Sequence, residues 1–182
     1  IPVFHDDQHG TAIIAVAGLV NALHLTGREL ADVRLVVNGA GAAGIACVEL
    51  VKSMGVAPSN VIMCDSRGVI YQGREAGMNQ WKSAHAVDTS ARSLADALEG
   101  ADVFMGVSVK GAVDQKMVAS MADKPIIFAM ANPDPEISPE DVKAVAHEVL
   151  RHRILPTYEA EAEGVNTDEI VTRVLERVPL DR

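Results

Sequence analysis

The sequence has few aromatic residues and few cysteines. Phe, Tyr and Trp make up 3% of its 182 residues, so Ala, Val, Ile and Leu must fill most of a core. Small branched side chains of this kind suit helices that pack closely on a parallel sheet. The two cysteines, Cys47 and Cys64, lie in apolar surroundings and lack metal-ligand spacing. They predict reduced, buried thiols in a cytoplasmic protein.

Positive charge and long apolar runs are also scarce. The formal net charge of −9 argues against nucleic acids and anionic membranes as partners, whereas local donors can still hold a small anion. No apolar run reaches the roughly 18 residues that span a bilayer, and no signal peptide is visible. With 48% hydrophobic residues, the composition predicts one domain with its own core, and room for an appendage.

Short apolar runs alternate with helical segments over most of the chain. Strands are predicted at 33–37, 60–64, 102–106 and 125–129, and helices at 11–25, 42–54, 93–98 and 114–121. This order predicts an α/β fold, a Rossmann-like parallel sheet with helices on both faces.

The pattern changes near the end of the chain. Two amphipathic helices are predicted there, one starting at the Ser138 cap with Pro139 behind it, the other at the Asn166 cap with Glu169 three residues on. We therefore predict a dinucleotide-binding domain over residues 1–137, with a truncated sheet, and a helical tail over residues 138–182.

The most specific motif is the glycine pattern in VRLVVNGAGAAG. Gly39, Gly41 and Gly44 fit G-x-G-x-x-G between a strand and a helix, where they permit a tight turn, approach of a pyrophosphate and close helix packing. Asp65 closes the next strand and suits the ribose hydroxyls of NAD, while Arg67 could instead receive the 2′-phosphate of NADP. The alternative is a packing turn in another α/β fold.

A second pattern is FHDDQHG near the start of the chain. Its adjacent carboxylates, Asp6 and Asp7, could bind a hard divalent cation such as Mg²⁺ or Mn²⁺. Acids before a helix are also common as partners of the helix dipole. His5 and His9 could bind zinc, although this spacing without a third ligand is more often found in surface or hydrogen-bonded histidines.

A third pattern, AMANPDPE, follows the fourth predicted strand. Ligands of open α/β sheets lie beyond the carboxyl ends of the strands. Asn132, held by Pro133, could offer its amide to a carboxylate or a carboxamide there. A turn residue without a ligand is the alternative.

Together these stretches resemble the NAD(P)-binding domain of bacterial-type malic enzyme over residues 1–137. The matching segments are IPVFHDDQHGTA, VVNGAGAAG, IMCDSRGVIYQGR, LEGADVFMGVSV and IIFAMANPDPEI, in the order of the family. The resemblance implies oxidative decarboxylation of malate to pyruvate with NAD or NADP and with Mg²⁺ or Mn²⁺. It also implies roles for single residues. Asp6 and Asp7 would be catalytic, with Asp7 also a metal ligand. Gly39, Gly41 and Gly44 would lie at the pyrophosphate, Asp65 at the adenosine ribose, and Asn132 on the malate or nicotinamide side.

The departures from the family pattern are equally informative. The family's catalytic Tyr and Lys and two more carboxylate ligands would precede Ile1, which would leave the metal site incomplete. A further strand and an Asn-rich loop would follow residue 137. The segment that follows instead resembles the C-terminus of MoxR-type AAA+ ATPases, although no Walker A motif is present. These features predict a truncated domain in a chimera, and an unusual native ending is the alternative.

Three functions follow from this interpretation. The first is a malic-enzyme-type oxidoreductase for a small dicarboxylate, alone or with a partner that supplies the missing half. The second is a dinucleotide-binding module without turnover. The third is another activity, such as a hydrolytic one, at His5, Asp6, Asp7 and His9 in a remodelled crevice. An open sheet edge and the apolar stripes of the tail predict a homo-oligomer, most simply a dimer.

Overall fold

A five-stranded sheet forms the centre of the computed structural model, which describes residues 1, 3–150 and 156–177. The strands are β1 (Leu35–Asn38), β2 (Val61–Asp65), β3 (Gly68–Val69), β4 (Val103–Gly106) and β5 (Ile126–Ala129). Their spatial order is β3-β2-β1-β4-β5. Only β3 is antiparallel, because it turns back directly from β2; the other pairs are parallel.

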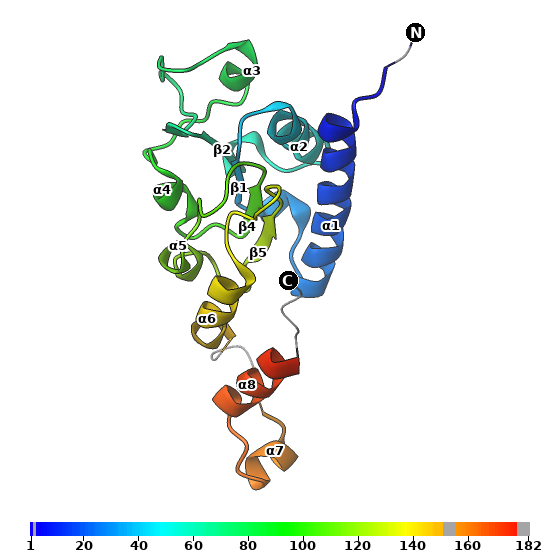
Figure 1. The fold of residues 1–182 in the computed structure, drawn as a ribbon, viewed down its shortest axis with the longest axis vertical. Coiled ribbons are helices and arrows are strands. Elements are labelled where there is room, and N and C mark those ends of the chain that lie inside the picture. Colours follow the sequence, from blue (N-terminus) through cyan, green and yellow to red (C-terminus); the bar gives the residue numbers. More distant parts are fainter. Residues whose placement is uncertain (2, 151–155, 178–182) are drawn as a thin grey trace.

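Helices cover both faces of this sheet (Figure 1), which confirms the predicted Rossmann-like α/β fold. α1 (Thr11–Thr26) and α2 (Ala42–Ser53) lie on one face, and α4 (Leu94–Leu98) and α5 (Gln115–Ala119) lie on the other. A short π-helix, η1 (Asp6–Gly10), precedes α1, and α3 (Gln80–Ser83) lies in the long connection after β3. Two short 3₁₀ helices, η2 (Leu30–Asp32) and η3 (Pro58–Asn60), complete the connections.

The core is divided between the two faces of the sheet. Along β1, Leu35 and Val37 belong to the cluster under α1 and α2, whereas Val36 belongs to the cluster under α4 and α5. This alternation follows from the two-residue period of a strand. Because β1 is buried on both faces, its sequence is apolar until Asn38.

Helix α1 is apolar on nearly all sides, a composition typical of a helix that is buried all round. Only one side is buried, since Leu19 is fully enclosed whereas Ile14 is 74% and Leu25 84% exposed. In addition, the helical stretch Asp6–Thr26 contains an 18-residue window with a mean hydropathy of 1.3, so it is long and apolar enough to cross a membrane by length and composition alone. A continuous apolar run of about 18 residues is still absent from the sequence, because polar residues such as Asn21 and His24 interrupt the segment, and the helix reaches that mean through scattered apolar residues. Core helices of soluble proteins meet the same criterion.

The last helices are α6 (Pro139–Leu150), α7 (Tyr158–Ala162) and α8 (Thr167–Arg177). Both predicted caps form, because Ser138 Oγ accepts the amide of Asp141 at 3.0 Å and Asn166 Oδ1 accepts that of Glu169 at 2.9 Å. α6 packs against α5, and α8 packs against α6 beyond the end of the sheet (Figure 1). The short α7 and β3 were not predicted. Residues 151–155 and 178–182 of the predicted tail lie outside the described residues.

Candidate functional site

The glycine loop after β1 is closed on its inner side and open at its tip. Gly39 has a φ of 118°, which L side chains rarely adopt, and a side chain there would also meet the carbonyl of Val107. A methyl group on Gly44 would collide with the carbonyl oxygen of Gly39. At Gly41, by contrast, an added Cβ would meet nothing within 4 Å. The three glycines therefore have the geometry of a tight turn, an open approach and a close helix contact.

Gly41 is also the N-cap of α2, and no side chain caps this helix. The first N–H groups of α2 are therefore free to donate, and the helix dipole adds partial positive charge there. A hollow of about 350 Å³ borders this end of α2, with Gln8 of η1 and Trp81 of α3 among its lining residues. Free donors, an open tip and a hollow beside it fit a dinucleotide pyrophosphate.

Asp65, the last residue of β2, is held by two cations. Arg74 donates to both carboxylate oxygens, at 2.7 and 2.8 Å, and Lys82 Nζ donates to Oδ2 at 2.7 Å. The backbone N–H of Arg67 also donates to Oδ1, at 2.9 Å. Burial alone would raise the pKa of Asp65, but the hydrogen bonds from Lys82, Arg74 and Arg67 outweigh it and lower that pKa. Asp65 is therefore an ionised anchor for the cations around it.

Arg74 ties this cluster to the backbone. Its side chain is 5% exposed and also donates to the carbonyls of Gly68, Val69 and Ala76. Lys82 is less buried, and the side chain of Arg67 is exposed. The cluster thus presents Lys82 and Arg67 toward solvent above a buried Arg74–Asp65 pair, at the β2 end of the site.

The loops after β4 and β5 form the other end of the site. Asn132 is exposed and precedes a cis peptide bond to Pro133. The fully buried Glu136 accepts from Ser108 N at 2.7 Å, Ser108 Oγ at 3.1 Å and Ala131 N at 3.0 Å. Glu136 therefore joins the loop after β4 to the loop that carries Asn132.

The aspartates near the start of the chain lie in η1. Asp6, Asp7, His5 and His9 are all exposed, and no residue of η1 is buried. Across residues 1, 3–150 and 156–177, no group of three or more His, Cys, Asp or Glu residues is placed to hold a metal ion. The carboxylates of η1 alone do not complete a Mg²⁺ or Mn²⁺ site, which needs more oxygen ligands.

The tertiary structure brings most of the predicted residues to one edge of the sheet. Because β1, β2 and β5 run parallel, the glycine loop, Asp65 and Asn132 all follow carboxyl ends at that edge. η1 packs against α2, and its Gln8 lines the same hollow as Gly41 of the glycine loop.

The sequence analysis missed Arg74, Lys82, Ser108 and Glu136. Both Arg74 and Lys82 lie in the long connection after β3, Lys82 on the short helix α3. Arg74 ends the segment IMCDSRGVIYQGR, but no periodic pattern predicted that either side chain would pair with Asp65. Glu136 carried a weak signal, because an acid next to the apolar Ile137 is unusual where a buried segment begins.

Comparisons with known proteins agree with this geometry. The sequence profile described as "Malic enzyme, NAD binding domain" matches residues 8–154. The match extends beyond residue 137, where the sequence analysis ended the malic-enzyme-like segment, and the findings do not support the ATPase resemblance of the tail.

The relatives are longer than this chain. The chain is 67% identical to the NADP-dependent malic enzyme of Rhizobium meliloti (strain 1021) over 82% of its own length and 20% of that protein. It matches the crystal structure of the NAD-dependent malic enzyme of Thermotoga maritima with a TM-score of 0.73 and 41% identity, over 79% of this chain and 39% of that one. A D-isomer specific 2-hydroxyacid dehydrogenase of Lactobacillus delbrueckii ssp. bulgaricus, 14% identical over 81% and 46% of the chains with a TM-score of 0.60, shares the fold.

Proposed function

The chain belongs to the malic enzyme family through its NAD-binding domain, and on this premise we propose that it binds the dinucleotide cofactor of a malic enzyme. The open, uncapped glycine loop at the N-terminus of α2 carries this proposal. The chain spans 20% of the Rhizobium relative. The oxidative decarboxylation of malate to pyruvate is therefore proposed for the protein of which this domain is a part.

Each end of the site has its own role in this proposal. The N–H groups at the start of α2, reached past Gly41, donate to the pyrophosphate, and Gly39 and Gly44 keep the loop compact. Asp65 and its cations lie at the adenosine ribose, and Asn132 faces the nicotinamide carboxamide or a malate carboxylate. Bound at this site, the oxidised cofactor would supply the hydride acceptor for the oxidation of malate at C2.

We propose NADP rather than NAD as the preferred cofactor. A free Asp65 would suit ribose hydroxyls, but both of its oxygens are paired with Arg74, and one also with Lys82. Lys82 and the exposed Arg67 therefore offer positive charge where a 2′-phosphate would lie. Relatives named for either cofactor match this chain. The proposal of NADP therefore rests on the positive charge of Lys82 and Arg67.

For the metal, we propose a smaller contribution from this chain. Asp7, with Asp6 beside it, supplies one ligand to Mg²⁺ or Mn²⁺, and the remaining ligands come from outside the described residues. We expect Mn²⁺ alone to bind this chain weakly in calorimetry and Asp7→Asn to remove that binding. A second candidate function, dinucleotide binding without turnover, is favoured for the isolated chain because its described residues form no three-ligand metal cluster.

Cofactor titration tests the proposal directly. NADPH and NADH are titrated against the fluorescence of Trp81, which lines the hollow beside the glycine loop. We expect saturable binding of both and tighter binding of NADPH. Lys82→Ala should reduce the affinity for NADPH more than the affinity for NADH. Lys116→Ala, on α5, should change the affinity for neither cofactor. No saturable binding at millimolar cofactor contradicts the proposal, and equal loss of both cofactors contradicts the role of Lys82.

A turnover assay separates the remaining candidates. Clean protein with malate, Mn²⁺ and NADP⁺ should form no detectable NADPH if the chain acts only as a cofactor-binding module. Steady formation of NADPH would instead assign the full reaction to this chain.

Location, assembly and domain division remain proposals. Two buried free cysteines support a reducing, cytoplasmic compartment. The exposed apolar residues Ile13, Ile14 and Leu25 on α1 support a homo-oligomer. A boundary between residues 137 and 138 stays a prediction, which limited proteolysis near Ser138 would check.

A further inference from the structure

A network of hydrogen bonds runs across the edge of the sheet where the parallel strands have their carboxyl ends, beneath the site. Asn38 Nδ2, at the end of β1, donates to Ser108 Oγ at 2.8 Å, and Ser108 Oγ donates to Glu136 Oε1 at 3.1 Å. Ser108 N reaches the same oxygen, and Ala131 N reaches Oε2. This network therefore links Asn38, which directly precedes the glycine loop, to the loops after β4 and β5.

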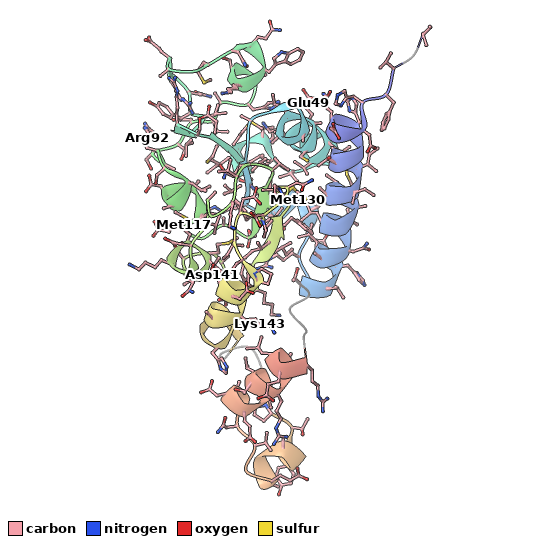
Figure 2. The ribbon with its side chains drawn as sticks, in the orientation of Figure 1. Glu49, Arg92, Met117, Met130, Asp141 and Lys143 are labelled. Atoms are coloured by element: carbon pink, nitrogen blue, oxygen red, sulfur yellow. The ribbon has the colours of Figure 1, made fainter. Side chains whose placement is uncertain are left out.

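Within this set of hydrogen bonds, Glu136 is the residue that joins the loop after β4 to the loop after β5. Its carboxyl group lies so close over Gly106, the last residue of β4, that a methyl group on that glycine would collide with it. Gly106 in turn accepts the N–H of Met130, which is labelled at the end of β5 in Figure 2. A carboxylate at the point where two strands end thus receives donors from both loops.

The chemistry of these contacts requires a carboxylate. All partners of Glu136 in this network are donors, and a carboxylate offers two oxygens that only accept. In Glu136→Gln, the side-chain NH₂ would face either the N–H of Ala131 or the N–H and hydroxyl of Ser108. One loop would lose its anchor while the volume of the side chain stayed nearly the same.

The exposed Asn132 follows Ala131 directly. Because the side chain of Asn132 is exposed, the backbone before it sets its orientation. Glu136 holds that backbone through the N–H of Ala131. Asp65 lies at β2, and Glu136 lies beyond β4 and β5, on the other side of β1. The two carboxylates therefore serve opposite halves of a dinucleotide bound across the glycine loop.

We propose that Glu136 is a positioning residue for the nicotinamide half of the cofactor site. It holds the loops after β4 and β5 in the conformation that presents Asn132, and it leaves the adenosine half unaffected. This inference rests on the proposed cofactor binding and adds a residue to which neither the motifs nor the comparisons assign a role.

The test compares a whole cofactor with its adenosine half. NADPH and adenosine 2′,5′-bisphosphate are titrated by calorimetry into the full chain and into Glu136→Gln. Because hydrogen bonds to charged groups are strong, we expect the Kd for NADPH to rise about tenfold. The Kd for adenosine 2′,5′-bisphosphate should stay within about twofold, since β2 and its cations are unchanged. Amide exchange at Ser108 and Ala131 should accelerate in the same variant.

Ser108→Ala provides a milder variant that still decides the question if Glu136→Gln does not fold. It removes the hydroxyl relay but keeps the Ser108 N–H, and it should weaken NADPH by about threefold without affecting the adenosine fragment. Ser120→Ala is the matched control, because its hydroxyl donates to the carbonyl of Met117 at an exposed position at the end of α5. It should leave both ligands unchanged.

The outcomes are distinguishable. Unchanged affinity for both ligands in the folded variants overturns the inference, and so does an equal loss for both, which would mark a general structural role. If the wild-type chain binds neither ligand, the proposed cofactor function fails first. If it binds both with the same affinity, the nicotinamide half contributes nothing and the inference fails alone.

Discussion

Replacing Asp65 by Asn tests whether the cluster at the end of β2 supports the fold. The change keeps the size of the side chain and removes its charge. In the wild type, the side chains of Asp65 and Arg74 are 8% and 5% exposed. The buried guanidinium of Arg74 would therefore lose the charged partner with which it pairs among the described residues. Lys82 Nζ, 2.7 Å from Oδ2, would face an amide instead of a carboxylate.

The expected loss follows from this burial. Removing one partner of a buried ion pair destabilises a protein by about 3–5 kcal/mol. Arg74 keeps three carbonyl acceptors, and Asn keeps one oxygen, so we expect a reduction of about 2–4 kcal/mol in the free energy of unfolding. For a chain of this size, that corresponds to a fall of about 5–15 °C in Tm.

Urea unfolding followed by circular dichroism measures this difference. Asp134→Asn is the matched control, because Asp134 pairs with Lys110 at 3.2 Å with 52% and 73% of the side chains exposed. An exposed pair of this kind contributes only about 0–1 kcal/mol. A loss below about 1 kcal/mol for Asp65→Asn, or one equal to that of the control, would refute the reasoning.

The pH dependence gives an independent check. The folded-state pKa of Asp65 lies below its ordinary value of 3.8. Its stabilising effect is therefore fully present above about pH 4 and is lost as the pH falls through the lower folded value. The gap between wild type and Asp65→Asn should be constant near neutral pH and should narrow only in acid.

Four further predictions concern the glycine loop and buried titratable groups. Gly41→Ala should leave the Tm nearly unchanged but weaken NADPH binding, because its methyl group enters open space that the cofactor would need. Gly44→Ala should lower the Tm as well, because its methyl group would strike the backbone carbonyl at the start of the loop. The thiols of Cys47 and Cys64, whose pKa values burial raises to about 11 and about 12, should not react with a thiol reagent at pH 8 until urea unfolds the chain; rapid reaction without urea would contradict their burial. Burial, reinforced by the ammonium group of Lys52, lowers the pKa of His85 below 6.5. The free energy of unfolding of the wild type should therefore fall as the pH drops from about 6.5. Urea titrations between pH 7 and 5 should show a smaller pH dependence of that free energy for His85→Asn.

Much of the fold was readable from the sequence because its signals are local. Alternating apolar runs and helical segments predicted β1, β2, β4 and β5 to within about two residues. Ser138 and Asn166 predicted helix starts, since a cap acts on the N–H groups that follow it immediately. β3 was not predictable in this way, because two residues carry no period and their pairing depends on the turn after Asp65.

The candidate site was readable only in part. The glycine pattern is a backbone requirement within a few residues, and its conformational consequences at Gly39 and Gly44 appear as expected. Asp65 pairs with Arg74 and Lys82, which lie in the long connection after β3. The spacing of these residues in the sequence therefore did not predict the pairing. The same is true of Glu136, whose donors lie in loops after two different strands.

The sequence by itself determined the order of strands and helices, the glycine loop and the family to which the domain belongs. Each of these is written in short patterns, because backbone geometry and hydrophobic period act between near neighbours. Only the tertiary structure decided how the charges at the site are used. Whether Asp65 is free or paired, and whether Glu136 lies in water or beneath two loops, depends on which strands lie side by side. In this protein the parallel order of β2, β1, β4 and β5 brings those distant residues to one edge and sets their hydrogen bonds.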